Sequence, residues 1–259
     1  MKSLKEYENI QEFFKVLDHN GMANEKNQLE FIINYVDSTE KHLSSVLDEL
    51  QNIRMELETI QKKPIKSAAI KTVDTVTEKV DTARKSIHDT KNFIKDTVNQ
   101  GLEDFKRTGK MALIKTIFRL DLKELLTKTQ NCFDKIQQNT FKSIDTLNML
   151  NKEIKTAHFH YYNIGRILVG KEPAEIQKKN NDKGVITLAQ KGLYRITEKI
   201  SILSARTQDG LLKLDGYEQK LVNELSSMKG EKGSVKKALT NYKKEHSESK
   251  KDRDVQKER

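Results

Sequence analysis

Apolar residues recur at helical spacing along most of this chain, and the most regular pattern lies between residues 29 and 60. Two interleaved seven-residue series run through it, and nine of their ten positions are apolar. Ile33 and Leu47 flank these series and widen the apolar stripe, which predicts packing against two neighbouring helices, as in a bundle. The helix-packing seam that we assign consists of Leu29, Ile32, Val36, Leu43, Val46, Leu50, Ile53 and Leu57.

Local signals divide the chain into helices. Asn20-Gly21 ends a short amphipathic helix at 3–19, because glycine readily takes the left-handed conformation at a helix end. Pro64 suits the first turn of a new helix, and Gly109 marks a break. The predicted organisation is an N-terminal helix within 1–22, a bundle over 23–228 with helices at about 24–62, 65–108, 121–169 and 185–228, and a tail at 229–259.

The third of these long helices begins at Asp121, with Glu124 three residues later as in a capping box. From Leu122 to Leu168 two seven-residue series return, with some polar members that weaken a seam but can set its register. In the fourth helix, Gly210 and Gly216 are candidate breaks.

Composition agrees with an all-α fold. The 259 residues include only 11 Gly and 2 Pro, too few for the turns of a sheet protein. Hydrophobic residues make up 35% and charged residues 33%, so the core must be thin, as in long helices packed along narrow stripes. We predict an elongated antiparallel helical bundle or coiled coil with a disordered basic C-terminal tail.

The pattern leaves the partner of the first long helix open. Its wide stripe can pack on the chain's own helices at 65–108 and 122–168, or it can pair with a second copy or a partner helix. Intramolecular and intermolecular coiled coils share the same heptads. We therefore expect self-association or a protein partner, but the sequence does not identify that partner.

Charge is distributed unevenly along the chain. The net charge is −6 over residues 1–60, +11 over 61–228 and +5 over 229–259. A basic body attracts polyanions such as nucleic acid, or an acidic segment of another copy. The tail lysines that could contact phosphates are Lys236, Lys237, Lys243, Lys244, Lys250 and Lys251. Six acidic residues interleave with the basic ones there, which favours a solvated, solubilising tail over phosphate contact.

Three features carry a resemblance: Gly21-Met22, the run YVDSTEK at 35–41, and the break at Pro64. With the residues around them, they resemble an uncharacterised family known only as a domain of unknown function. Its members are typically encoded on conjugative or integrative mobile elements of Gram-positive gut bacteria. The resemblance extends loosely to about residue 205, and the tail resembles basic tails on proteins of such elements. It implies a genomic context and supplies no functional residues.

No motif for catalysis, cofactor binding or metal binding emerges. The run GRILVGKE has P-loop spacing at Gly165, Gly170 and Lys171, but Glu172 replaces the required Ser or Thr, and a helix end explains the same residues. His158 and His160 are two apart on a helix and so point to different sides. We expect instead a partly buried aromatic cluster around Tyr161.

Localisation follows from what the chain lacks. Cys132 is the only cysteine, so no intramolecular disulfide can form. The N-terminus has no signal-peptide core, and no apolar run approaches the ~20 residues of a membrane span. These features predict a reduced, cytoplasmic protein. The run KMALIKTIFRL at 110–120 could lie at a membrane surface, although a core role fits its short length better.

The expected function is that of a non-enzymatic accessory or scaffolding protein of a mobile element, acting through protein–protein contacts. A nucleic-acid-associated protein of transfer or replication machinery and a peripheral membrane protein are the alternatives. No cofactor and no small-molecule substrate are expected.

Overall fold

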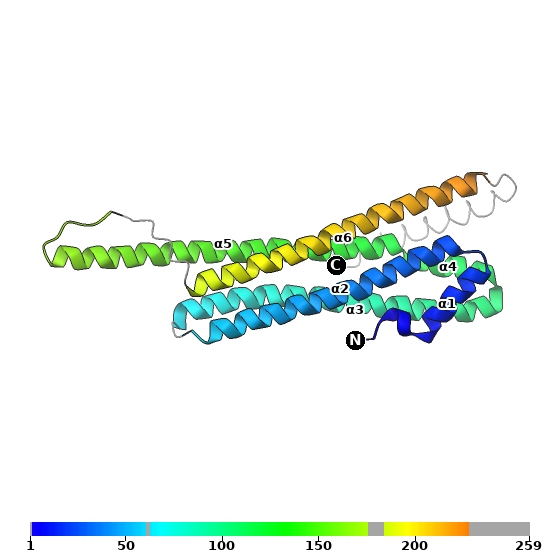
Figure 1. The fold of residues 1–259 in the computed structure, drawn as a ribbon, viewed down its shortest axis with the longest axis horizontal. Coiled ribbons are helices and arrows are strands. Elements are labelled where there is room, and N and C mark those ends of the chain that lie inside the picture. Colours follow the sequence, from blue (N-terminus) through cyan, green and yellow to red (C-terminus); the bar gives the residue numbers. More distant parts are fainter. Residues whose placement is uncertain (1, 61–62, 176–183, 228–259) are drawn as a thin grey trace, which may run out of the picture. The chain divides into compact units, whose positions relative to one another are not determined.

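The computed structural model describes residues 2–60, 63–175 and 184–227. Contacts divide the chain into two units, one ending at Leu211 and the other beginning at Leu212. The architecture below is that of the first unit (Figure 1). In the second unit, the described residues continue helix α6 (Val185–Ser227) to its end. The predicted disordered tail at 229–259 lies outside the described residues.

The N-terminal segment contains two helical pieces where the sequence predicted one. A 3-10 turn, η1 (Leu4–Glu6), precedes α1 (Glu8–His19). Tyr7 between them is extended, and its N–H donates to the Leu4 carbonyl and closes the turn. Gly21 has a φ of 68° and ends α1 as predicted.

Two long helices follow. Helix α2 (Ala23–Glu58) ends four residues before the predicted boundary, and α3 (Lys63–Thr108) carries Pro64 in its first turn. A proline is tolerated there because the first turn has no intrahelical acceptor for its missing N–H.

A short helix then leads to the longest one. Gly109, with a φ of 67°, separates α3 from α4 (Lys110–Leu120). Helix α5 (Leu122–Leu168) begins at Asp121, whose side chain accepts a hydrogen bond from the Glu124 N–H, as the sequence predicted.

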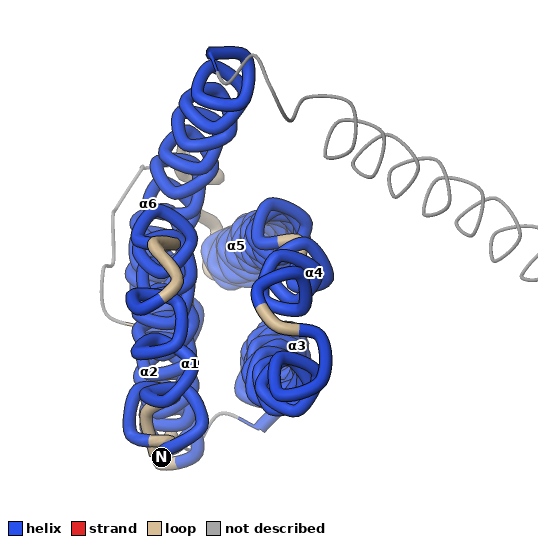
Figure 2. Tube along the Cα trace, turned by 90° about the vertical axis from the view of Figure 1, so that its right-hand side faces the viewer, coloured by secondary structure: helices blue, strands red, loops and turns tan. Residues whose placement is uncertain are grey.

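Four helices form an antiparallel up-and-down bundle (Figure 2). Helix α2 lies between α3 and α6, and α5 lies diagonally across from α2. The predicted all-α antiparallel bundle is therefore confirmed. Helix α3 lies directly beside α2, whereas α5 faces α2 across the core, where Leu126 of α5 and Phe31 of α2 both approach Gly210 of α6. Helix α6 is the second direct neighbour of α2. The Tyr35 hydroxyl on α2 lies 2.6 Å from Thr207 Oγ1 on α6.

Threonines of the α5 seam can be buried because their hydroxyl groups hydrogen-bond to backbone carbonyls of the same helix. The Thr140 hydroxyl is fully buried and donates to the Ile136 carbonyl one turn earlier. Thr129 does the same to the Leu125 carbonyl. Such back-bonding leaves the outward side of a threonine apolar enough to pack in a helical core.

Glycine allows two helix pairs to approach closely. A Cβ on Gly101 of α3 would lie 2.3 Å from Thr116 Oγ1 of α4. In the sequence Gly210 is a candidate break of the last helix, but α6 continues through it. A Cβ there would lie 3.1 Å from a Leu126 methyl of α5, so this glycine lets α6 pack tightly against its neighbour.

Candidate functional site

The predicted seam of α2 lies inside the bundle. Each of its eight residues is at most 3% exposed. A buried seam cannot also bind a second molecule without opening the bundle. Its part in function is to hold the scaffold together.

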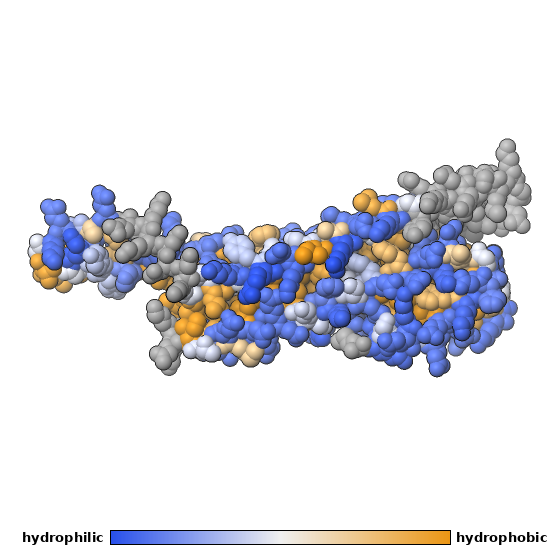
Figure 3. All heavy atoms as spheres, in the orientation of Figure 1, coloured by the Kyte–Doolittle hydropathy of each residue, from blue (hydrophilic) through white to orange (hydrophobic). Residues whose placement is uncertain are grey.

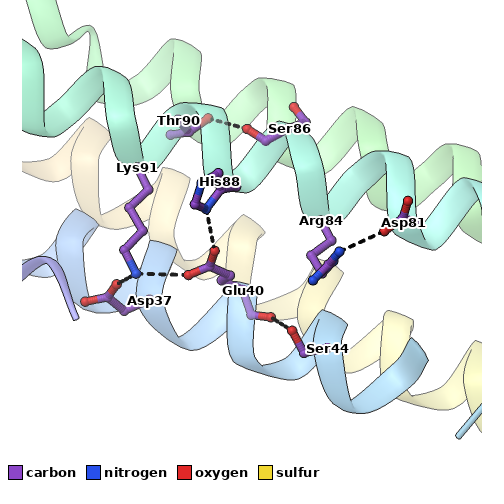
Figure 4. Close-up of polar contacts among 9 residues, drawn as sticks. All are labelled: Asp37, Glu40, Ser44, Asp81, Arg84, Ser86, His88, Thr90 and Lys91. Carbon is purple, nitrogen blue, oxygen red and sulfur yellow. Dashed lines mark hydrogen bonds and ion pairs between the residues drawn. The ribbon is translucent and has the colours of Figure 1, made fainter. Parts of the chain in front are cut away.

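A cluster of charged side chains joins α2 to α3 (Figure 4). The Lys91 ammonium donates to Glu40 Oε2 at 2.9 Å and lies 2.8 Å from Asp37 Oδ1. His88 Nδ1 lies 3.0 Å from Glu40 Oε1, and must donate because a carboxylate only accepts. Glu40 and Lys91 are almost completely buried. The charges of Glu40 and Lys91 are therefore stabilised by their partners rather than by water.

The partners decide the ionisation of the cluster. Burial by itself would raise the pKa of the Glu40 carboxyl, but hydrogen bonds from Lys91 and His88 outweigh it, and the pKa lies below its ordinary value. Burial likewise acts to lower the pKa of Lys91, and Asp37 and Glu40 raise it above its ordinary value. Both groups are charged at neutral pH.

The same cluster fastens the N-terminal segment to the bundle. Asp37 Oδ2 accepts hydrogen bonds from the Ser3 hydroxyl at 2.6 Å and the Leu4 N–H at 2.8 Å. Leu4 is fully buried beside it. The cluster thus sets the register of three segments, a role well attested for buried polar groups in helical bundles.

Sequence reasoning overlooked this cluster, although a signal was present. Asp37 and Glu40 belong to the YVDSTEK run, and Glu40 sits in the same seven-residue series as the apolar Ile33 and Leu47. Although Lys26 and Arg54 continue this series, a carboxylate between two apolar members fits a buried position, and a buried carboxylate needs a partner of opposite charge. The sequence does not say that Lys91 supplies it, since 51 residues separate the two.

The cluster offers little room for a substrate. The adjoining cavity has a volume of about 80 Å³ and is bordered by Lys2, Tyr7 and Lys95. Cofactor and ligand sites usually need roughly 300 Å³ or more. An open groove between α2 and α6 is larger, about 440 Å³. Its carboxylate Glu49 is already paired with Arg195 and Lys199. Neither place provides an enclosed site with a nucleophile and a base.

Other predicted candidates have ordinary explanations. Gly170 has a φ of 72° and follows the last turn of α5, so the P-loop-like run is a helix end. The described residues contain no group of three or more side chains able to hold a metal ion. On α4, Leu113 and Leu120 are buried, so its apolar face serves the bundle. The six tail lysines lie outside the described residues.

The expected aromatic cluster around Tyr161 is wrong. Tyr161 is 76% exposed, and His158 and His160 are exposed as well. They belong to residues 148–168, the C-terminal part of α5, which we call the α5 extension. It continues the α5 seam past Leu147, the last fully buried member of its series.

Half of the large exposed hydrophobic residues of the described chain lie on this α5 extension and its end. Figure 3 shows hydrophobic residues at the free end of the helix, beside mostly hydrophilic ones along the rest of the visible face. Of the fourteen large hydrophobic residues that are exposed in the described chain, seven lie between residues 149 and 169. Leu168 is 81% exposed and Ile164 52% exposed. Isolated exposed apolar residues are common on proteins, but a contiguous set marks an interaction surface.

The chain then turns back along one side of the α5 extension. The Ala174 N–H donates to Asn163 Oδ1 at 2.9 Å, and Arg166 Nε donates to the Glu172 carbonyl at 2.7 Å. Asn163 and Arg166 lie on the helix face opposite the seam series, given 100° per residue. The described return segment therefore leaves the seam side uncovered.

Comparison with known proteins identifies the family. A family of unknown function, DUF6674, matches residues 6–259. The chain belongs to this family. The match confirms the predicted resemblance to a family of unknown function, and it covers the bundle, the α5 extension and the tail. No curated protein matches the chain, and no solved structure does. None of its described helices is both long enough and apolar enough to pass through a bilayer.

Proposed function

We propose that this protein is a non-enzymatic scaffolding or accessory protein that acts through protein–protein contacts in the cytoplasm. The observation that carries the proposal is the exposed apolar seam of the α5 extension. The seam residues of the α5 extension follow the spacing of a coiled coil, and an apolar stripe with this spacing fits a partner helix. The bundle and its buried charge cluster position this helix and leave its end projecting.

The setting that we propose is a conjugative or integrative mobile element. It rests on the resemblance of the YVDSTEK run, the Gly21-Met22 pair and the Pro64 break. Multicomponent transfer and replication machineries need helical adaptors, and an exposed coiled-coil seam suits such a task. Membership of a family of unknown function is compatible with this setting.

Site-specific photo-crosslinking in the native host cells tests the protein–protein part. Tyr161 is replaced by a photoreactive phenylalanine derivative, and Phe141 provides the matched control. Phe141 lies on the same helix and is 49% exposed, but it is outside the α5 extension. We expect protease-sensitive adducts of defined mass from position 161, resistant to nuclease, and few from position 141. Absence of such adducts, or adducts that vanish with nuclease, would overturn the proposal.

Nucleic-acid association is the second candidate, favoured by the net charge of +10. Electrostatic binding weakens steeply with salt, because counterions are released from the phosphates. Fluorescence anisotropy with labelled DNA measures the affinity at 50 and 200 mM salt. If this candidate is right, the affinity should fall roughly tenfold to a thousandfold between the two concentrations. Binding that is absent at the lower salt concentration removes this candidate.

A further inference from the structure

The α5 extension has a feature beyond its exposure, namely the order of its seam residues. The seam of the α5 extension consists of Leu150, Ile154, Ala157, Tyr161, Ile164 and Leu168. Leu150 and Ile154 are half-exposed at the end of the bundle, and the other four are exposed. The identity of the partner argued below rests on the proposed function.

The series is symmetric about residue 159. Read from both ends towards the middle, Leu150 corresponds to Leu168, Ile154 to Ile164, and Ala157 to Tyr161. In an antiparallel coiled coil, residues of one series lie beside residues of the other series on the opposite helix. Two copies of this helix therefore place leucine against leucine, isoleucine against isoleucine, and a small alanine against a large tyrosine.

The flanking charges also suit self-pairing. Positions beside the seam are occupied by Asn151, His158 and Gly165 on one side and by Glu153, His160 and Ile167 on the other. The cations Lys152, Lys155 and Arg166 lie on the outer face, given 100° per residue. Two copies of a basic helix can thus approach without opposing like charges at the seam.

The intramolecular packing already uses the same arrangement. Up to Leu147, α5 is covered by antiparallel neighbours, and Asn148 Oδ1 accepts a hydrogen bond from Gln190 near the start of α6. Beyond that point α6 has no residues to offer, because it begins at Val185. An antiparallel helix from a second copy would continue the coverage that α6 begins, and would complete the burial of Leu150 and Ile154.

We propose that two copies of this protein associate through their α5 extensions, paired antiparallel and centred on Phe159. The α5 extension is about 30 Å long at ~1.5 Å per residue and presents roughly a dozen residues to its partner. Stable interfaces use about 20–30 residues a side. The dimer is therefore weak, with a dissociation constant in the micromolar range, and forms when copies are brought together at a shared assembly.

Sedimentation equilibrium of the full chain from about 5 to 200 µM tests the pairing. We expect a monomer–dimer equilibrium for the wild type, and at least a tenfold weaker association for Ile164→Lys with Leu168→Lys. Both side chains are exposed, so circular dichroism should show an unchanged bundle. Met149→Lys with Tyr162→Lys is the matched control, since these residues are also exposed but lie off the seam.

Orientation is tested by crosslinking single cysteines in a Cys132→Ser background with a short bis-maleimide. A mixture of Ile154→Cys and Ile164→Cys proteins should give crosslinked dimers, and each protein alone should give few. Efficient crosslinking of either protein by itself indicates parallel pairing and overturns the inference. The inference is also overturned if the wild type stays monomeric at 200 µM. It is overturned as well if Ile164→Lys with Leu168→Lys leaves the dissociation constant unchanged.

The two failures can be told apart. If the protein is monomeric but Tyr161 still crosslinks to a different protein in cells, only self-pairing falls. If position 161 captures no protein at all, the proposed function falls with it.

Discussion

The two halves of α5 share one sequence pattern and have opposite fates. From Leu122 to Leu147 the seam residues are buried between α3 and α6. From Leu150 to Leu168 the same seven-residue spacing continues, and the side chains become half-exposed and then exposed. The apolar content of the second half is no lower than that of the first.

The difference teaches that heptad periodicity identifies a face that needs a partner, without saying where the partner is. In the first half the chain supplies its own neighbours. In the second half it supplies none among the described residues. Since exposed apolar surface of this extent is unusual in a monomer, the second half is the part of the fold best suited to recognition.

The largest expected effect comes from placing charges in the covered seam. Leu43→Lys with Leu50→Lys introduces two lysines at fully buried sites, each costing several kcal/mol, against a total stability of roughly 5–15 kcal/mol. We expect loss of cooperative unfolding in urea, followed by circular dichroism. Ile164→Lys with Leu168→Lys should leave the unfolding midpoint unchanged at low micromolar protein. A normally folded Leu43→Lys, Leu50→Lys protein would contradict the core assignment.

A sharper comparison uses two aromatic residues of one α5 series. Phe133 is fully buried, so Phe133→Ala should cost about 3–5 kcal/mol. Tyr161 occupies the equivalent position in the α5 extension and is exposed, so Tyr161→Ala should change stability by less than about 0.5 kcal/mol. Urea denaturation of the monomer measures both. Equal losses would mean that the α5 extension is covered in solution.

Acid should weaken the covered half of the molecule through Glu40. Its folded pKa is lowered, so its contribution to stability is present above its unfolded pKa of 4.5 and is lost as pH falls through the folded value. Glu40→Gln should cost roughly 2 kcal/mol at neutral pH and reduce the pH dependence. Thermal unfolding from pH 7 to 3 tests this. An unaltered pH profile in the variant would place the acid-sensitive group elsewhere.

The smallest effect compares two glycines. Gly101→Ala forces a methyl group against Thr116 and should cost about 1–2 kcal/mol. Gly165 in the α5 extension has open space around it, so Gly165→Ala should be neutral or stabilising by up to ~1 kcal/mol. Melting temperatures of the monomer distinguish them. A stabilised Gly101→Ala would show that α3 and α4 pack less closely than described.

Local signals proved to be good guides to the helices. Pro64, Gly109 and the Asp121–Glu124 cap were readable because each acts on its own backbone within a few residues. The interruption at Tyr7 was not readable in this way. The turn before Tyr7 is held by Asp37, which accepts hydrogen bonds from Ser3 and Leu4, 34 and 33 residues away.

Contacts between helices were harder to foresee for the same reason. Gly210 looks like a helix breaker in the sequence, but its function is to admit Leu126 and Phe31. The partner of Glu40 could not be foreseen either, because Lys91, which donates to it, lies 51 residues away. Each of these depends on a residue that only the arrangement of the helices brings close.

The sequence by itself determined that this chain forms long amphipathic helices, where most of them begin and end, and which face of each is apolar. These properties follow from backbone sterics and the 3.6-residue period, which act locally. Only the tertiary structure decided which faces are covered. Coverage depends on helix order and relative length. Because α6 begins at Val185, the end of α5 is left exposed.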